Sequence, residues 1–441
     1  MNRGRVYSWI PDRDPSGNGR VVQEIVQLER IEAPKEGTAR LHGRFVRVVN
    51  AGMIYEPNPS GGAPLETRLG DARPDANGDF LFEPGRGGGR IDKVSVADPE
   101  IRRRYVQASH FGEVNSYYHV DRVGAYVDSL LGELGAPALP PVRVLVAAHH
   151  AATVRAGVRD GVRRTGRWVP FQGGHYRLPS SRDTSRIPPP VLPGHAEPPG
   201  AFRTYVIVEW DPVHPDGEIH LGPGWKLLRH GALVECAGGA YRANASHNAG
   251  ILYHEYGHHL TRHTADFCAN AGRPPDRQIN VKTALDEGTC DYLAAAMMQT
   301  PHIWALHRRH DDEYRHARSL SSAVGMSSFD AGPGADQHAN GTIWAASLWD
   351  LRGHLAGDDP DAAREVDRMV VLGLILLGRL RGSEEPPTTA TLRRARRDFA
   401  TALQCLLAAD GELYSGRHHD VILRVFARRG ITARQVVNTG S

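Results

Sequence analysis

The stretch ILYHEYGHHL, residues 251–260, holds the pattern around which the rest of the chain can be interpreted. It contains His254-Glu255-x-x-His258, followed directly by a further histidine. Residues four apart on a helix share a face, so the two histidines can direct their imidazoles at one metal ion. Glu255 would emerge about 100° further round the helix, beside the ion, where a carboxylate can act as a general base. The pattern is short enough to arise by chance, so it needs support from other segments.

The composition is that of an ordinary soluble globular protein, long enough for two or three domains. The chain has 441 residues, of which 40% are hydrophobic and 23% are charged. A formal charge of +3 is too small to predict nucleic acid or a membrane surface as a partner. The beginning of the chain shows no apolar targeting segment, and the most apolar run, 369–378, is too short to span a bilayer. We therefore expect a cytoplasmic protein, and the sequence does not predict its oligomeric state.

Residues 1–104 are expected to form a small β-rich domain. The region is rich in turns and strand patterns, and Asn77-Gly78 is placed where a hairpin could turn. Asp75, Asn77 and Asp79 lie close together but miss the spacing of a calcium-binding loop. A plain turn is therefore expected here, and a calcium site is possible but has no support from the sequence.

Residues 105–245 are expected to form an α/β lobe. Apolar residues follow helical spacing through 107–135, and strand patterns follow at 142–148 and 205–210. Between these strands, residues 178–200 are rich in proline and predict a surface insertion.

Residues 246–441 are expected to be mainly helical and to carry the metal site. Ser246 can cap the helix that holds the histidine motif, and apolar residues recur through Leu260. A second helix is predicted for TALDEGTCDYLAAAMM, 283–298, where Glu287 and Asp291 are four apart. Glu287 is the best candidate for a third metal ligand, and Asp291 could accept a hydrogen bond from a ligand imidazole.

A third helix is predicted for DQHANGTIWAASLWDLRGHL, 336–355. His338 lies just before its start, where it could donate a hydrogen bond to a developing oxyanion. Asp330 or Asp336 could orient its ring. The four cysteines are too few for a disulfide scaffold, and buried thiols are expected, although a bridge between Cys268 and Cys290 is possible.

Together the three segments resemble the gluzincin metallopeptidases, the thermolysin and fungalysin group. NAGILYHEYGHHL resembles their active-site helix, DEGTCDYLA their third-ligand segment and HANGTIWAASLWDL their downstream histidine helix. The resemblance covers about residues 107–435. It implies an α+β, thermolysin-like two-lobed metallopeptidase, with a mixed α/β N-lobe, a mainly helical C-lobe and a zinc site in the cleft between them.

The resemblance also implies a role for each matching side chain. The zinc ligands would be His254, His258 and Glu287. Water polarised by zinc would attack a peptide carbonyl, with Glu255 as general base passing the proton to the leaving amine. Asp291 would hold a ligand histidine, and His338 would donate to the transition state.

Some features of the gluzincin metallopeptidases are not found in this sequence. An inhibitory propeptide is not recognised, and the calcium ligands of the family cannot be placed. Tyr241, in GGAYRAN, lies upstream where an edge strand would bind a peptide backbone, and is a weak candidate for substrate contact.

The leading hypothesis is a zinc endopeptidase that acts on a particular peptide or protein substrate. Either residues 1–104 or the insertion 178–200 could restrict access to its cleft. One alternative is a latent or pseudo-enzymatic peptide-binding module with a structural zinc ion, although the intact Glu255 favours activity. Another is a zinc aminopeptidase, but AGGAYRAN has no carboxylate that could anchor an α-amine.

Overall fold

The computed structural model describes most of the chain between residues 2 and 433, and the statements below concern only the described residues. These are 2–10, 20–33, 37, 39–56, 65–85, 93–94, 99–156, 164–170, 173–177, 203–208, 214–227, 233–235, 244–265, 283–303, 318–331, 335–357, 359–382 and 399–433. Tyr241, the insertion 178–200 and the predicted bridge from Cys268 lie outside them. Cys290 and Cys405 are described, and both are buried.

A four-stranded mixed sheet forms the centre of the N-terminal half. Its strands are ordered β10-β12-β7-β3. The strands β3 (Val46–Asn50), β7 (Val142–Val146) and β12 (Glu218–Leu221) run parallel, and β10 (Gly174–Arg177) runs antiparallel at the edge. Valines alternate along β3 and β7, as expected for strands with one face on a core. Because β3 pairs with β7, this sheet crosses the domain boundary expected at residue 104.

The remaining strands form smaller sheets. They are β1 (Arg3–Ile10), β2 (Arg20–Gln27), β4 (Met53–Glu56), β5 (Leu65–Arg68), β6 (Lys93–Val94), β8 (His149–Ala156), β9 (Arg164–Pro170), β11 (Arg203–Val208), β13 (Trp225–Leu227) and β14 (Leu233–Glu235). The turn expected at Asn77-Gly78 is confirmed. The Asp75 carboxylate accepts the backbone N–H groups of Asn77 and Asp79, and the Asp79 carboxylate pairs with Arg3. The two carboxylates therefore stabilise the turn and connect it to β1.

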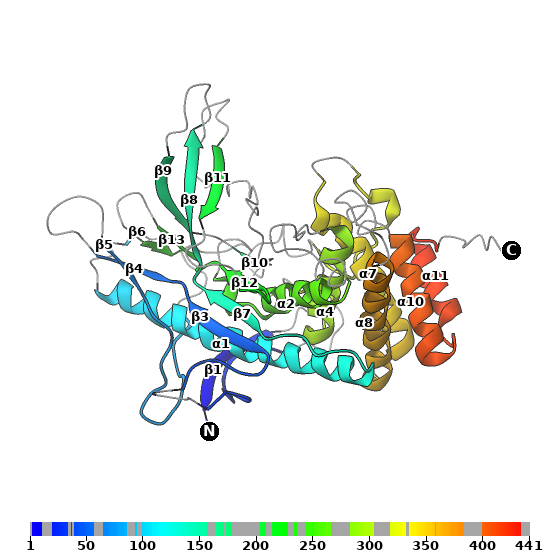
Figure 1. The fold of residues 1–441 in the computed structure, drawn as a ribbon, viewed down its shortest axis with the longest axis horizontal. Coiled ribbons are helices and arrows are strands. Elements are labelled where there is room, and N and C mark those ends of the chain that lie inside the picture. Colours follow the sequence, from blue (N-terminus) through cyan, green and yellow to red (C-terminus); the bar gives the residue numbers. More distant parts are fainter. Residues whose placement is uncertain are drawn as a thin grey trace.

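The long helix α1 (Pro99–Glu133) lies beside this sheet (Figure 1). The sequence predicts a helix for 107–135, and the structure extends it by two turns towards the N-terminus. A row of fully buried side chains, including Val120, Val123 and Val127, covers the sheet. Burial of this stripe supplies most of the stabilisation of such a helix.

The C-terminal half is helical, as expected. It contains α2 (Ala249–His263), α4 (Ala284–Met298), α7 (Gln337–Ala356), α8 (Pro360–Gly382), α10 (Phe399–Tyr414) and α11 (His419–Arg428), with short 3-10 turns η1 (Ala245–His247) and η3 (Met326–Ser328). In Figure 1, α2 and α4 lie between the strands and the outer helices α7, α8, α10 and α11. The structure is thus a mixed α+β fold compatible with a thermolysin-like one.

Two glycines let α4 pack closely against α2 and α7. A Cβ atom added at Gly257 would lie 2.7 Å from the Cα atom of Cys290, and one added at Gly288 would collide with the carbonyl oxygen of Gly341. Any other residue at either position would push the helices apart. These glycines therefore explain why the histidine helix and the carboxylate helix can meet.

The helix α2 begins differently from the expectation. Ser246 does not cap it, because the turn η1 intervenes and the chain becomes α-helical only after Asn248. The Asn248 side chain accepts the backbone N–H of Gly250 at 2.8 Å, which satisfies one of the donors exposed at the helix start. The prediction of a capped start was right, but the capping residue was wrong.

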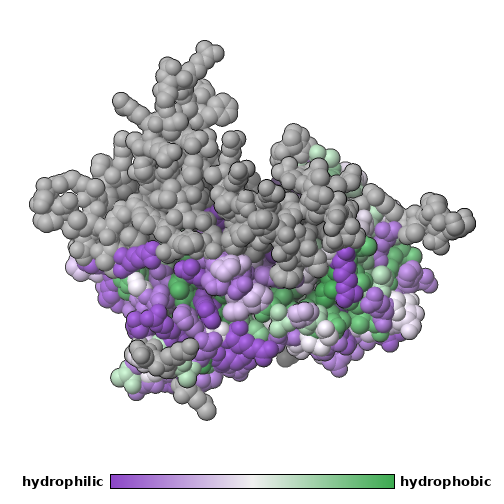
Figure 2. Space-filling model, in the orientation of Figure 1, coloured by the Kyte–Doolittle hydropathy of each residue, from purple (hydrophilic) through white to green (hydrophobic). Residues whose placement is uncertain are grey.

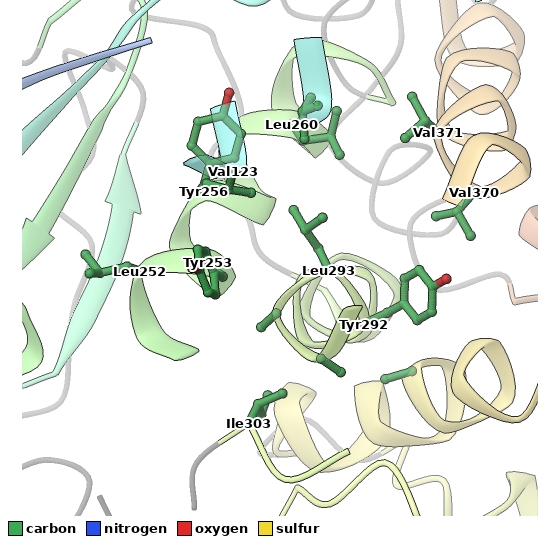
Figure 3. Close-up of a cluster of buried hydrophobic side chains, with 14 of the residues drawn as sticks. Val123, Leu252, Tyr253, Tyr256, Leu260, Tyr292, Leu293, Ile303, Val370 and Val371 are labelled. Carbon is green, nitrogen blue, oxygen red and sulfur yellow. The ribbon is translucent and has the colours of Figure 1, made fainter. Parts of the chain in front are cut away.

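A hydrophobic core joins α1, α2, α4 and α8. Figure 3 shows side chains of this cluster, among them Val123, Tyr256, Leu293 and Val370. At the surface, hydrophilic side chains prevail over the N-terminal half, and apolar ones gather beside the C-terminal helices (Figure 2). Among the described residues, no helix is long and apolar enough to cross a membrane.

Candidate metal centre

Helices α2 and α4 bring the two motif histidines to one carboxylate. The Nε2 atom of His254 lies 3.1 Å from Oε2 of Glu287, and the Nε2 atom of His258 lies 3.6 Å from the same oxygen. All three residues are at least 98% buried. The structure therefore brings together the three residues that the sequence singles out as metal ligands.

Helix α7 brings a third imidazole to the same oxygen. The Nε2 atom of His338 lies 3.2 Å from Oε2 of Glu287. His254, Glu287 and His338 can be grouped as a potential metal site, since their ligand atoms lie within 4.8 Å of one another. His338 differs from the two motif histidines in its exposure, because 39% of its side chain is accessible.

The hydrogen bonds on the far sides of the rings fix which nitrogens face Glu287. The Nδ1 atom of His254 lies 2.7 Å from Asp291, and that of His258 lies 3.1 Å from Asp286, so each Nδ1–H donates to a carboxylate. In the neutral rings the Nε2 atoms then carry lone pairs directed at the anionic Glu287. Two lone pairs facing a carboxylate repel it unless a cation lies between them.

The hydrogen bonds of the buried atoms at this point also indicate a cation between the two rings and Glu287. Within the described residues, neither Nε2 of His258 nor Oε2 of Glu287 has a hydrogen-bond partner, although both atoms are buried. Buried polar atoms nearly always find a partner. The set of two imidazole nitrogens and one carboxylate oxygen, with a place left for water, is the usual donor set of a catalytic zinc ion. The residues present therefore fit zinc.

Asp291 holds the first histidine, as the sequence predicts, and is itself held by an arginine. The Nε atom of Arg318 donates to Oδ2 of Asp291 at 3.1 Å, and Nη2 donates to Oδ1 at 2.5 Å. Asp291 is fully buried, so a fixed cation at this distance stabilises its negative charge. Sequence reasoning missed Arg318, which lies 27 residues beyond Asp291 in the chain.

Asp286 supports the second histidine in the same way, and sequence reasoning missed it as well. Oδ1 of Asp286 also accepts a hydrogen bond from Thr261 at 2.6 Å, and Oδ2 pairs with Arg262 at 2.5 Å. The buried sulfur of Cys290 lies 3.3 Å from Nδ1 of His258. His258, Asp286 and Cys290 can also be grouped as metal ligands. Arg262 already neutralises this carboxylate, so a hydrogen-bonded support accounts for the group better than a second ion.

The charges around the site keep its carboxylates ionised. Burial alone would raise the pKa of Glu287, but the imidazoles of His338 and His258 outweigh burial and hold that pKa well below its ordinary value. Burial likewise opposes the charge of Asp286, but Arg262 lowers its pKa. Burial disfavours the charged form of His254, yet Asp291 and Glu287 raise its pKa to about 9. The site is therefore built to hold positive charge.

The edge strand β10 passes directly beside Glu255. A Cβ atom added at Gly174 would lie 3.0 Å from Oε1 of Glu255, so no side chain separates this part of the strand from the carboxylate. Among the described strands, β10 pairs only with β12. No further strand pairs with its second edge among the described residues.

His259, the extra histidine of the motif, is not part of the metal centre. It is fully buried, and its Nε2–H donates to the carbonyl oxygen of Pro140 at 2.9 Å. Its Nδ1 atom lies 3.1 Å from the hydroxyl of Tyr176 on β10. Burial, followed by the charge of His263, lowers the pKa of His259 well below its ordinary value. This neutral ring joins α2 to the sheet.

The sequence offers Asp330 and Asp336 as residues that could orient His338, and in the structure Asp336 does so. Oδ1 of Asp336 accepts the backbone N–H of His338 at 2.9 Å and lies 3.1 Å from its Nδ1 atom. Asp330 instead exchanges backbone hydrogen bonds with the side chain of Asn340. The hydrogen bond from His338 lowers the pKa of Asp336 to about 2.

Comparison with known proteins agrees with this geometry. Residues 237–434 match the family model of the fungalysin metallopeptidases (M36). This stretch contains α2, α4 and α7 and therefore every side chain that converges on Glu287. Members of the family are zinc metalloendopeptidases, hydrolases that act on peptide bonds. A search of curated proteins found no match.

Proposed function

We propose that this chain, whose residues 237–434 match the family model of the fungalysin metallopeptidases, holds one zinc ion through His254, His258 and Glu287. The observation that carries the assignment is the approach of both Nε2 atoms to Oε2 of Glu287, at 3.1 Å and 3.6 Å. With Nδ1–H of each ring donating to an aspartate, these atoms present lone pairs to a common point. Of the hypotheses drawn from the sequence, an active zinc endopeptidase is the one that this geometry favours.

Zinc, when bound, acts as a Lewis acid that polarises a carbonyl oxygen and makes water more acidic. The chain's own residues supply the proton transfers. Glu255 accepts a proton from the attacking water and delivers it to the nitrogen of the leaving amine. Its place beside β10, 4% exposed, keeps this carboxylate close to the peptide and away from bulk water.

His338 stabilises the charge that develops on the substrate oxygen. Its Nδ1–H donates to Asp336, and in its doubly protonated form the ring also donates from Nε2. Because Nε2 lies 3.2 Å from Oε2 of Glu287, a donor here is next to the zinc ligands. A prepositioned donor of this kind acts on the transition state rather than on the bound substrate.

A peptide substrate would bind as an additional strand along β10. The second edge of β10, with which no described strand pairs, would offer backbone donors and acceptors to an extended chain, and Gly174 lets a face of β10 lie against Glu255. Backbone hydrogen bonds require no free terminus, so this arrangement favours cleavage inside a chain. A substrate contact of Tyr241 and a selective role of residues 178–200 stay predictions, because both lie outside the described residues.

The proposal is tested with a library of peptides derived from a proteome, in which new termini are identified by mass spectrometry. The control is Glu255→Gln, which keeps the size of the side chain and leaves the zinc ligands in place. We expect cleavage at internal bonds by the wild type and a rate roughly 10²–10⁴ lower for the variant, because the general base is absent.

Other outcomes separate the alternatives. Cleavage confined to the first residue of each peptide would indicate an aminopeptidase. Zinc bound by the wild type without any cleavage would contradict the proposed activity and favour a peptide-binding module. Equal cleavage rates for the wild type and Glu255→Gln would show that Glu255 is not the general base.

A further inference from the structure

Two polar side chains of α1 lie buried between the N-terminal strand β1 and the start of α2. Asn115 and His119 are four residues apart and therefore on the same face of α1. They are 0% and 2% exposed. Buried polar groups cost stability unless they are hydrogen-bonded, so the partners of both side chains indicate what the pair is for.

His119 connects β1 to the residue before the first zinc ligand. Its Nε2 atom lies 2.7 Å from the carbonyl oxygen of Tyr7, and its Nδ1 atom lies 2.7 Å from the hydroxyl of Tyr253. A carbonyl oxygen can only accept, so Nε2 carries the proton and Nδ1 accepts from the tyrosine. Burial lowers the pKa of His119 to about 3, which keeps the ring neutral, and the two hydrogen bonds select this tautomer. Tyr253 precedes His254 directly in α2.

Asn115 makes the parallel connection one turn earlier. Its Oδ1 atom accepts the backbone N–H of Tyr7 at 2.9 Å, and its Nδ2 group donates to the carbonyl oxygen of Ser246 at 2.8 Å. Both backbone groups of Tyr7 are therefore bound by α1. The two side chains contact the α2 segment at points seven residues apart, on either side of its N-cap, Asn248.

Packing around these bonds leaves little freedom for the α2 segment. The ring of Tyr7 meets Phe111 edge-on at 4.9 Å between centroids, and Phe111 meets His247 at 4.8 Å. His247 also donates from Nε2 to the carbonyl oxygen of Ala108 on α1 at 2.8 Å. The same stretch of α1 is thus joined to β1 on one side and to η1 and α2 on the other.

We propose that Asn115 and His119 are positioning residues of the peptidase, which fix the rotation and height of α2 relative to the sheet, and that β1 locks them in place. A small rotation of α2 would move His254 and Glu255 together, because both follow Tyr253 directly. In this account the hairpin of β1 and β2 supports the metal centre, although it lies far from it in the sequence. The inference rests on the proposed zinc site.

The test compares two matched substitutions in α2, made in the full chain. Tyr253→Phe removes only the hydroxyl that bonds His119. Tyr256→Phe is the control, since Tyr256 is equally buried and its hydroxyl has no hydrogen-bond partner among the described residues. We expect Tyr253→Phe to lower kcat roughly three- to tenfold with KM unchanged, and Tyr256→Phe to leave both unchanged.

A second substitution and a second measurement separate positioning from simple stabilisation. Asn115→Asp keeps the acceptor for Tyr7 but loses the donor to Ser246, and should lower kcat at least as much. With cobalt in place of zinc, the visible absorption of Tyr253→Phe and Asn115→Asp should shift relative to the wild type and to Tyr256→Phe. Melting temperatures identify any variant that is only less stable.

Lowered melting temperatures with unchanged kcat and unchanged cobalt spectra in both variants would overturn the proposal and leave a purely structural contact. The cobalt spectrum requires no turnover. A wild type that binds metal but cleaves nothing would therefore contradict the proposed function, and the spectral comparison would still decide the role of Asn115 and His119.

Discussion

The two motif histidines and His338 reach the same oxygen of Glu287, but their surroundings differ. His254 and His258 are 2% and 0% exposed, and each is held by a buried aspartate that pairs with an arginine. His338 has 39% of its side chain exposed, and its partner Asp336 has 68% exposed. The first two rings are fixed from behind, whereas the third is reached by solvent.

This difference in burial supports the proposal that His254 and His258 bind the metal, whereas His338 contacts the substrate. Burial and a fixed hydrogen-bond partner hold a ligand imidazole in one tautomer and one orientation, which raises metal affinity. An exposed ring at the start of α7 is accessible to a peptide. Proximity alone groups His338 with His254 and Glu287, and we propose from its surroundings that it acts in catalysis instead.

The largest loss of activity is expected from His338→Ala, which tests whether the exposed histidine differs in role from the two buried ones. If His338 donates to the developing oxyanion, its removal should lower kcat by roughly 10²–10³ and leave the zinc content unchanged. Steady-state kinetics and elemental analysis of the same preparation provide both values. His338 lies in the first turn of α7, not before the helix as the sequence indicates, and a rate close to that of the wild type would show that it has no catalytic role.

A smaller effect is expected from the aspartates behind the ligand histidines. Asp291→Asn and Asp286→Asn keep the size of the side chain and remove its charge, so the arginine behind each loses its partner and the imidazole is held less firmly. Each should weaken zinc binding roughly 10- to 100-fold, measured by competition with a chelator. The control is Asp361→Asn, an exposed carboxylate in the first turn of α8, which should bind zinc as the wild type does. If both variants bind zinc as tightly as Asp361→Asn does, Asp291 and Asp286 do not contribute to zinc binding.

The sequence identified the side chains whose chemistry has a fixed spacing. His254 and His258 share a helix face, and Asp291 follows Glu287 by one turn, so periodicity alone places them in pairs. Asp286 is the neighbour of Glu287 and lies about 100° away on α4. It reaches His258 only because Gly257 lets the two helices approach, which no pattern within either helix reveals.

Contacts between distant segments that belong to no recognised motif could not be predicted. Arg318 reaches Asp291 from the segment between α4 and α7, with a positive φ of 59° that no sequence pattern indicates for an arginine. Likewise, the sequence predicts strands within residues 1–104 and at 142–148, but not the parallel pairing of Val46–Asn50 with Val142–Val146. The expected division of the chain at residues 104 and 245 stays a prediction.

The most direct measurement is the zinc content per chain of purified His258→Ala and His338→Ala beside the wild type. We expect one zinc ion in the wild type and in His338→Ala, and loss of zinc from His258→Ala. Zinc retained by His258→Ala and lost from His338→Ala would contradict this expectation, and would assign the ion to His254, Glu287 and His338.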